Sequence, residues 1–172
     1  MSVVKTTRLN IRKLCMDDAA FMCALLNDSE WRRFIRDQGK RTIEDAANYI
    51  KNSAMQSYQD LGFGLFLVEL KTAVPVGICG FVKRDYLPDV DIGFAFLPQF
   101  RKKGYAVEAA SVLLSYAQQH LGMSRVAAIT QKENLASIKV LEKIGLTFEK
   151  QIVCDAGQQL QLYSINFKKL DT

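Results

Sequence analysis

One stretch restricts the possible folds more than any other: between residues 89 and 119, a strand, a short basic turn and a long helix follow one another directly. In the strand, large apolar residues alternate with small ones, which predicts one face packed in a core and one open face. The core face consists of Val90, Ile92, Phe94 and Phe96. The open face has a single carboxylate, Asp91, beside Gly93 and Ala95. A face this small leaves room for a thin ligand that lies on the sheet.

The turn after this strand has the composition of an anion-binding loop. Three consecutive cations, residues 101–103, stand directly before Gly104, where the helix begins. The first N–H groups of a helix have no partner within the helix, and the positive end of the helix dipole adds to their attraction for anions. Gly104 lets the backbone approach an oxygen closely, and Ala106 is small as well. Residues 101–106 therefore predict a pyrophosphate site.

The composition is that of an ordinary globular protein, with 49% hydrophobic and 24% charged residues. A length of 172 residues predicts one domain, residues 1–172. The net charge of +5 favours an anionic partner. The four cysteines are scattered, which predicts neither a disulfide framework nor a metal site. Without a secretory signal or an apolar run of about 20 residues, we expect a cytoplasmic protein with no membrane partner.

Hydrophobic periodicity and turn signals predict the element order β-α-α-β-β-β-α-β-α-β-β. The expected strands are residues 6–14, 62–71, 76–82, 90–97, 125–129, 147–154 and 159–167. The expected helices are residues 17–27, 42–58, 104–121 and 134–144. This order indicates an α/β (α+β) fold: a mixed, mostly antiparallel central sheet of about six to seven strands, with four helices packed across it.

Residues 101–106 resemble the Gln/Arg-x-x-Gly-x-Gly/Ala loop of the GNAT superfamily of N-acetyltransferases. The flanking residues 97–100 and 107–109 are similar to its RimJ/RimL branch. A second RimJ/RimL-like motif follows in residues 134–145, with Asn134 and Ser137 in the first helical turn and Glu-Lys-x-Gly at the helix end. The predicted element order is also that of the GNAT fold, so the resemblance covers nearly the whole chain.

The resemblance implies an enzyme, an N-acetyltransferase that moves an acetyl group from acetyl-CoA directly to a primary amine, without a metal. It points to a protein N-terminal α-amine of the ribosomal-protein type as acceptor; the alternatives are a small-molecule amine, or a CoA-binding sensor module without catalysis. The implied cofactor-binding residues are Phe94, Phe96, Arg101, Lys102, Lys103, Gly104, Tyr105, Ala106 and Asn134. In relatives the segment between the first two helices borders the acceptor site, which here implies Trp31 and Phe34.

Two residues are the candidate catalysts. Asp91 is the one carboxylate on the open strand face and is the candidate base, although an ion pair with Arg84 would explain it equally well. Ser137, matched to the family motif, would assist the departing thiolate, with Tyr105 and Tyr163 as alternatives. The residues alone favour plainer roles, an N-cap for Asn134 and a hydroxyl bonded to its own helix for Ser137.

A cluster of cations lies near Trp31 and Phe34, which is a composition that nucleic-acid binding also uses. These cations are Arg32, Arg33, Arg36, Lys40 and Arg41. We interpret them as a solvated face around a substrate loop, so nucleic acid is not an expected partner. The protein is expected to be a monomer or a homodimer.

Overall fold

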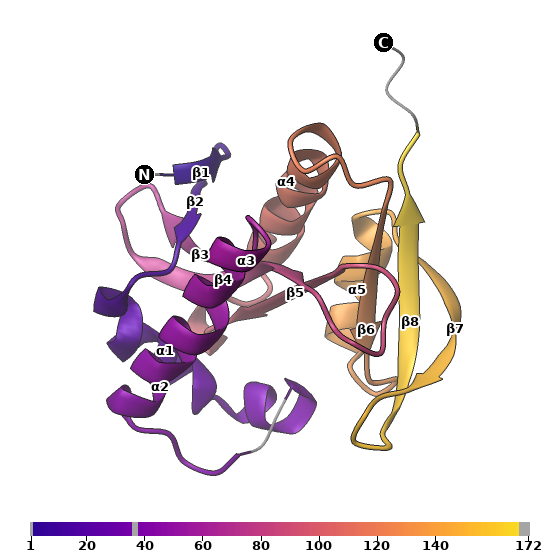
Figure 1. Ribbon diagram of the computed structural model, residues 1–172. Helices are drawn as coiled ribbons and strands as arrows, with labels where there is room; N and C mark the ends of the chain where they lie inside the picture. The colour runs from indigo at the N-terminus through magenta and orange to yellow at the C-terminus, as the bar shows by residue number, and fades with distance from the viewer. Residues whose placement is uncertain (1, 36–37, 169–172) are drawn as a thin grey trace.

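The computed structural model describes residues 2–35 and 38–168, and within them the chain forms one mixed eight-stranded sheet (Figure 1). The strands are β1 (Ser2–Lys5), β2 (Leu9–Lys13), β3 (Leu65–Leu70), β4 (Pro75–Val82), β5 (Asp91–Phe96), β6 (Arg125–Thr130), β7 (Thr147–Val153) and β8 (Gln159–Asn166). Their order across the sheet is β1-β2-β3-β4-β5-β6-β8-β7. Neighbouring strands are antiparallel except β5 and β6, which are parallel.

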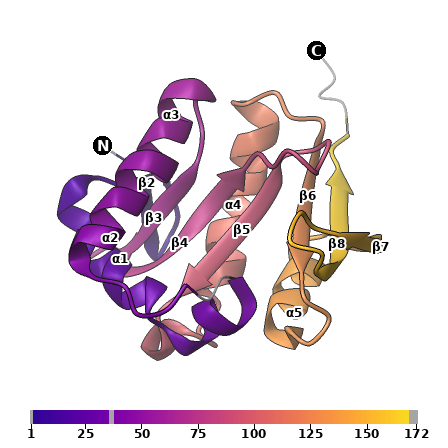
Figure 2. The same cartoon turned by 60° about the horizontal axis from the view of Figure 1, so that its bottom comes forward.

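Helices cover both faces of the sheet (Figures 1 and 2). The α-helices are α1 (Ala19–Leu26), α2 (Ile43–Tyr49), α3 (Gln56–Asp60), α4 (Tyr105–Gln119) and α5 (Leu135–Lys143). The short helical segments are η1 (Met16–Asp18), η2 (Trp31–Ile35), η3 (Ile50–Met55) and η4 (Pro98–Phe100). Alternation along β3 divides the core, since Phe66 and Val68 pack on the side of α4 while Leu67 packs on the side of α1 and α2.

The predicted fold class and element order are confirmed, and the element counts differ in two places. The edge strand β1 was not predicted, because its four residues are too short to show a period of two; it pairs with β2 through an irregular register. The helix predicted at 42–58 is present as α2, η3 and α3 in succession, because the hydrogen bonding changes to the π type at Ile50. The core face predicted for β5 is also confirmed, with Ile92 and Phe96 buried in the cluster under α4.

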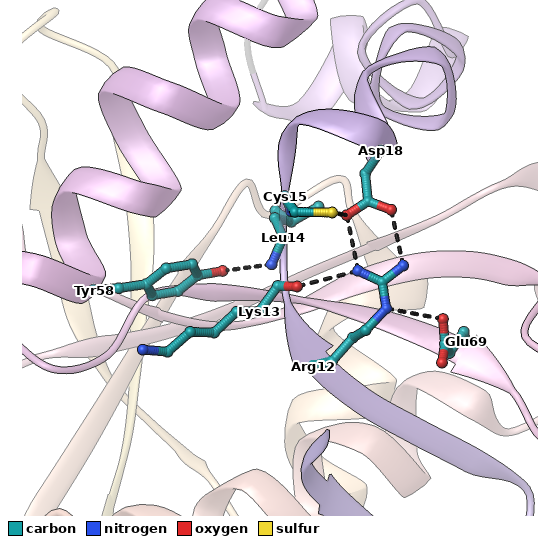
Figure 3. Close-up of polar contacts among 7 residues, drawn as sticks. All are labelled: Arg12, Lys13, Leu14, Cys15, Asp18, Tyr58 and Glu69. Atoms are coloured by element: carbon teal, nitrogen blue, oxygen red, sulfur yellow. Dashed lines mark hydrogen bonds and ion pairs between the residues drawn. The ribbon is translucent and has the colours of Figure 1, made fainter. Parts of the chain in front are cut away.

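A polar network fixes the end of β2 against its neighbours (Figure 3). Arg12 binds Asp18 through two nitrogen atoms at 2.9 Å and Glu69 through Nε at 3.1 Å. Tyr58 accepts the Leu14 N–H at 3.0 Å. These bonds hold β2, η1, α3 and β3 together on the side of the sheet away from β6.

Candidate active site

Strands β5 and β6 separate soon after they meet, and this separation opens the sheet. Their register contains one pair, Asp91 opposite Ala127, with the Ala127 N–H donating to the Val90 carbonyl at 2.9 Å. Figure 2 shows the two strands diverging from that point toward the ends where α4 and α5 begin. Along β5, the Leu97 N–H donates to Val76 on β4, so alternate residues such as Phe94 turn their backbone groups toward the opened edge.

A cleft of about 1330 Å³ occupies this opening and continues past α2 and η2. Every residue singled out in the sequence as catalytic, cofactor-binding or substrate-binding lines the cleft, except Lys103 and Tyr163, one of the two alternatives to Ser137. The lining residues of that set are Trp31, Phe34, Asp91, Phe94, Phe96, Arg101, Lys102, Gly104, Tyr105, Ala106, Asn134 and Ser137. Arg32, Arg33 and Arg41 of the cation cluster also line it, whereas Arg36 lies outside the described residues.

The start of α4 presents unpaired backbone donors. No acceptor in the described part of the chain takes the N–H groups of Gly104, Tyr105, Ala106 or Val107; the first helical bond is Glu108 N–H to the Gly104 carbonyl, at 3.0 Å. Gly104 has a left-handed backbone with φ of 81°, which explains why a glycine stands there. The donors and the helix dipole form a site suited to an anion of two phosphate groups.

Arg8 supports this loop from behind, which the sequence did not indicate. Its guanidinium donates to the Lys103 carbonyl at 2.9 Å and to Glu108 at 2.6 Å, and it lies 4.7 Å from the centre of the Tyr105 ring. Binding the Lys103 carbonyl from outside fixes the direction of that peptide. Arg8 therefore holds the loop in the conformation in which its N–H groups are available.

The side chain of Arg101 does not add its charge to the anion site in the simple way expected from three consecutive cations. It is hydrogen-bonded to the Asp28 carboxylate, and its Nε lies 3.3 Å from Glu30. Two carboxylates thus compensate its charge. Among the described residues Lys102 makes no ion pair, and its backbone also has a positive φ, of 59°.

Asp91 lies at the floor of the cleft, only 1% exposed. The ion pair with Arg84 that the sequence offered as an alternative role is present, because Arg84 Nε donates to Asp91 Oδ1 at 2.9 Å. The position in the cleft is the one that a catalytic base would need. Burial raises the pKa of the Asp91 carboxyl, and the charge and hydrogen bond of Arg84 offset only part of that rise. A carboxylate with a raised pKa is a better proton acceptor than a free aspartate.

The first turn of α5 holds the second motif. Asn134 is its N-cap, with Oδ1 accepting the Ser137 N–H at 3.2 Å, so the plain capping role is present. The Ser137 hydroxyl has no hydrogen-bond partner among the described residues, and so the expected bond to its own helix is not formed. Of the two tyrosines considered with Ser137, Tyr105 lines the cleft, whereas Tyr163 is absent from the lining and donates to Gln161 at 3.3 Å.

Residues 8–147 match the family model described as "Acetyltransferase (GNAT) domain". This chain belongs to the GNAT acetyltransferase family. Among its relatives, the Uncharacterized N-acetyltransferase YnaD of Bacillus subtilis is 30% identical over 146 residues, which are 85% of this chain and 83% of the relative.

Solved acetyltransferases have the same fold. A GNAT-family acetyltransferase from Bacillus anthracis superposes with a TM-score of 0.80 at 30% identity, covering 95% of this chain and 97% of that one. RimL, a ribosomal L7/L12 alpha-N-protein acetyltransferase solved with coenzyme A, gives a TM-score of 0.83 at 15% identity, covering 96% and 98% of the two chains. At that identity the second likeness shows the fold alone.

Several cleft residues of this acetyltransferase were not found from the sequence as site residues. Tyr86 follows Arg84 in the loop before β5, and burial raises the pKa of its hydroxyl. Asn48 and Asn52 line the cleft from α2 and η3, and Asp155 lines it from the hairpin between β7 and β8. Only the long-range packing of these segments brings the residues to the cleft, because each segment has an ordinary local sequence.

Two further observations concern membrane-spanning helices and metal ligands. Within residues 2–35 and 38–168, none of the helices combines the length and the apolarity that crossing a bilayer requires. In the same residues, no three side chains of His, Cys, Asp or Glu gather as metal ligands would.

Proposed function

We propose that this acetyltransferase uses acetyl-CoA to acetylate a primary amine directly. The observation that carries the proposal is the row of unpaired backbone N–H groups from Gly104 to Val107, which line the same cleft as a buried carboxylate. The main-chain donors suit the diphosphate of CoA, and the opened edge of β5 suits its extended arm. The RimL neighbour was solved in complex with coenzyme A.

Different cleft residues have different roles in the proposed reaction. Acetyl-CoA supplies the thioester that the amine attacks. Asp91 accepts the amine proton, directly or through water, because its burial raises its pKa. A backbone N–H of the Phe94 to Phe96 stretch, turned toward the opened edge, can stabilise negative charge on the thioester oxygen. Ser137, whose hydroxyl makes no hydrogen bond with the described residues, can donate to the departing thiolate, which has a reference pKa of about 8.5.

The acceptor is proposed as an N-terminal α-amine, with a small-molecule amine as the alternative. An α-amine has a pKa near about 8, well below that of a lysine, so less work is needed to deprotonate it. Trp31 and Phe34, the proposed acceptor-site residues, line the cleft together with several cations, and these cations do not favour a polyamine. Thiol release measured with a panel of tripeptide amides and a panel of small amines separates the two. A CoA-binding module without catalysis would release no thiol with either panel.

The anion site is tested with two matched glycine variants. Gly104→Glu places a carboxylate among the N–H donors and should abolish CoA binding measured by calorimetry. Gly122, just after the end of α4, has a similar positive φ of 64° and nothing within 4 Å of an added Cβ, so Gly122→Glu has the same charge and a similar backbone strain. It should bind CoA as the wild type does. Unchanged affinity in a folded Gly104→Glu protein would contradict the assignment.

A further inference from the structure

Residues 28–35, which we call the strap, cross one end of the cleft and are tied at both ends. At the first end, Asp28 Oδ2 accepts the N–H groups of Glu30 at 3.0 Å and Trp31 at 3.3 Å, and it also accepts from Arg101. At the second end, Gln131 Nε2 donates to the carbonyls of Arg33 at 3.3 Å and Phe34 at 3.2 Å. The strap therefore connects the loop after β5, which contains Arg101, with the segment after β6, which contains Gln131.

The first tie is the stronger one. The Arg101 guanidinium is a planar fork, and it reaches both Asp28 and Glu30. The Asp28 side chain is only 5% exposed, so water screens this contact little. The backbone of the same arginine continues within three residues into the unpaired N–H groups at the start of α4. Arg101 thus has its main chain in the anion site and its side chain in the strap.

The strap in turn positions the aromatic wall of the cleft. Asp28 fixes the first turn of η2 by accepting the Trp31 N–H. Trp31 is 7% exposed, meets the Tyr49 ring edge-on at 6.2 Å and lines the cleft. A shift of Arg101 would therefore move Asp28, and with Asp28 the backbone that carries Trp31.

We propose that Arg101 is a positioning residue that couples the diphosphate site to the strap, so that binding of CoA sets the shape of the acceptor pocket. A ligand shifts a conformation only through contacts that differ between two states. Here a diphosphate held by residues 104–107 would fix the loop, the fixed loop would hold the Arg101 fork on Asp28, and the strap would be ordered around Trp31. The proposal rests on the proposed function, because it needs CoA in the anion site.

Trp31 is the only tryptophan in the sequence, so its fluorescence reports on the strap without a label. We would titrate the full-length protein with CoA and follow Trp31 emission and calorimetric binding in parallel. In the wild type, the Trp31 emission and the calorimetric binding signal should change over the same range of CoA concentration, with the same midpoint. In Arg101→Gln, the emission change at CoA saturation should fall by more than half, whatever change calorimetry measures in the CoA dissociation constant. Arg101→Lys keeps the charge but not the fork, and should give an intermediate response.

Two further variants make the test specific. Lys102→Gln removes the neighbouring cation, which makes no ion pair with a described residue, and should weaken CoA binding while leaving the emission change at saturation intact. Glu30→Gln removes the more exposed arm of the tie and should reduce the emission change without unfolding the protein.

Each outcome has a separate meaning. A wild-type emission that stays constant while calorimetry shows saturation contradicts the coupling, and so does an Arg101→Gln protein that responds as the wild type does. If CoA fails to bind the wild-type protein at all, the proposed function itself is wrong.

Discussion

Two buried aspartates of this acetyltransferase each bind an arginine, and their pKa values shift in opposite directions. Asp18 binds Arg12 near the end of β2, and Asp91 binds Arg84 at the floor of the cleft. The two carboxylates are 6% and 1% exposed. The pKa of Asp18 lies below its ordinary value, whereas that of Asp91 lies above it.

The number of donors explains the difference. Burial raises the pKa of both carboxyls, but around Asp18 it is outweighed by two bonds from Arg12, by the Cys15 N–H at 2.9 Å and by the positive charge of Arg12 (Figure 3). Asp91 has one arginine bond at 2.9 Å, which does not outweigh its deeper burial. An aspartate that is fully bonded stabilises structure, while one that is buried and underbonded beside a cleft can take a proton.

The largest expected effect is on stability at the first site. Asp18→Asn leaves Arg12 without its main counter-charge, and breaking a buried pair in this way should lower the free energy of unfolding by about 3 kcal/mol. Urea denaturation measures this change. Asp17→Asn is the matched control, since Asp17 is the exposed neighbour in the same turn and should change stability by less than about 0.5 kcal/mol. Equal effects of the two variants would show that the Asp18 network contributes nothing special.

The second effect is on turnover at the cleft. Asp91→Asn keeps the shape of the side chain but cannot accept a proton, so kcat should fall about 100-fold, equivalent to about 2.7 kcal/mol. Stability should change by less than about 1 kcal/mol, because Arg84 is 36% exposed and remains solvated. Asp85→Asn, an exposed neighbour in the same loop, is the control for turnover. A fully active Asp91→Asn protein would leave Asp91 as a structural ion-pair partner like Asp18.

The sequence predicted the features of this site that are local. The loop at 101–106, the N-cap at Asn134 and the alternation of β5 depend on neighbouring residues, and the structure has all three. The sequence could not predict which carboxylates Arg101 meets, because Asp28 is 73 residues away, nor that Arg8, just before β2, supports the loop. The degree of burial of Asp91, which decides the direction of its pKa shift, likewise depends on how β5 and β6 separate.

The smallest expected effect, and the sharpest comparison of the two aspartates, is the pH dependence of stability. In the unfolded chain both aspartates have a pKa near about 3.9. Between about pH 3.9 and the lower pKa of Asp18 in the folded protein, the unfolded chain binds more protons at Asp18 than the folded protein does. The stabilisation that Asp18 provides is therefore lost as the pH falls through the folded pKa of Asp18. Above about 3.9, up to the raised folded pKa of Asp91, the folded chain binds more protons, and the Asp91 contribution falls as the pH rises.

Urea denaturation of the wild type, Asp18→Asn and Asp91→Asn between about pH 3 and pH 7 measures both contributions as differences from the wild type. The Asp18 difference should be largest at neutral pH and shrink in acid, and the Asp91 difference should change with the opposite slope. The acid limb of the pH–rate profile should also follow Asp91 and disappear in Asp91→Asn, because only the ionised carboxylate accepts a proton. If the two difference curves had the same slope, the number of hydrogen-bond donors around a carboxylate would not distinguish a structural aspartate from a catalytic one in this fold.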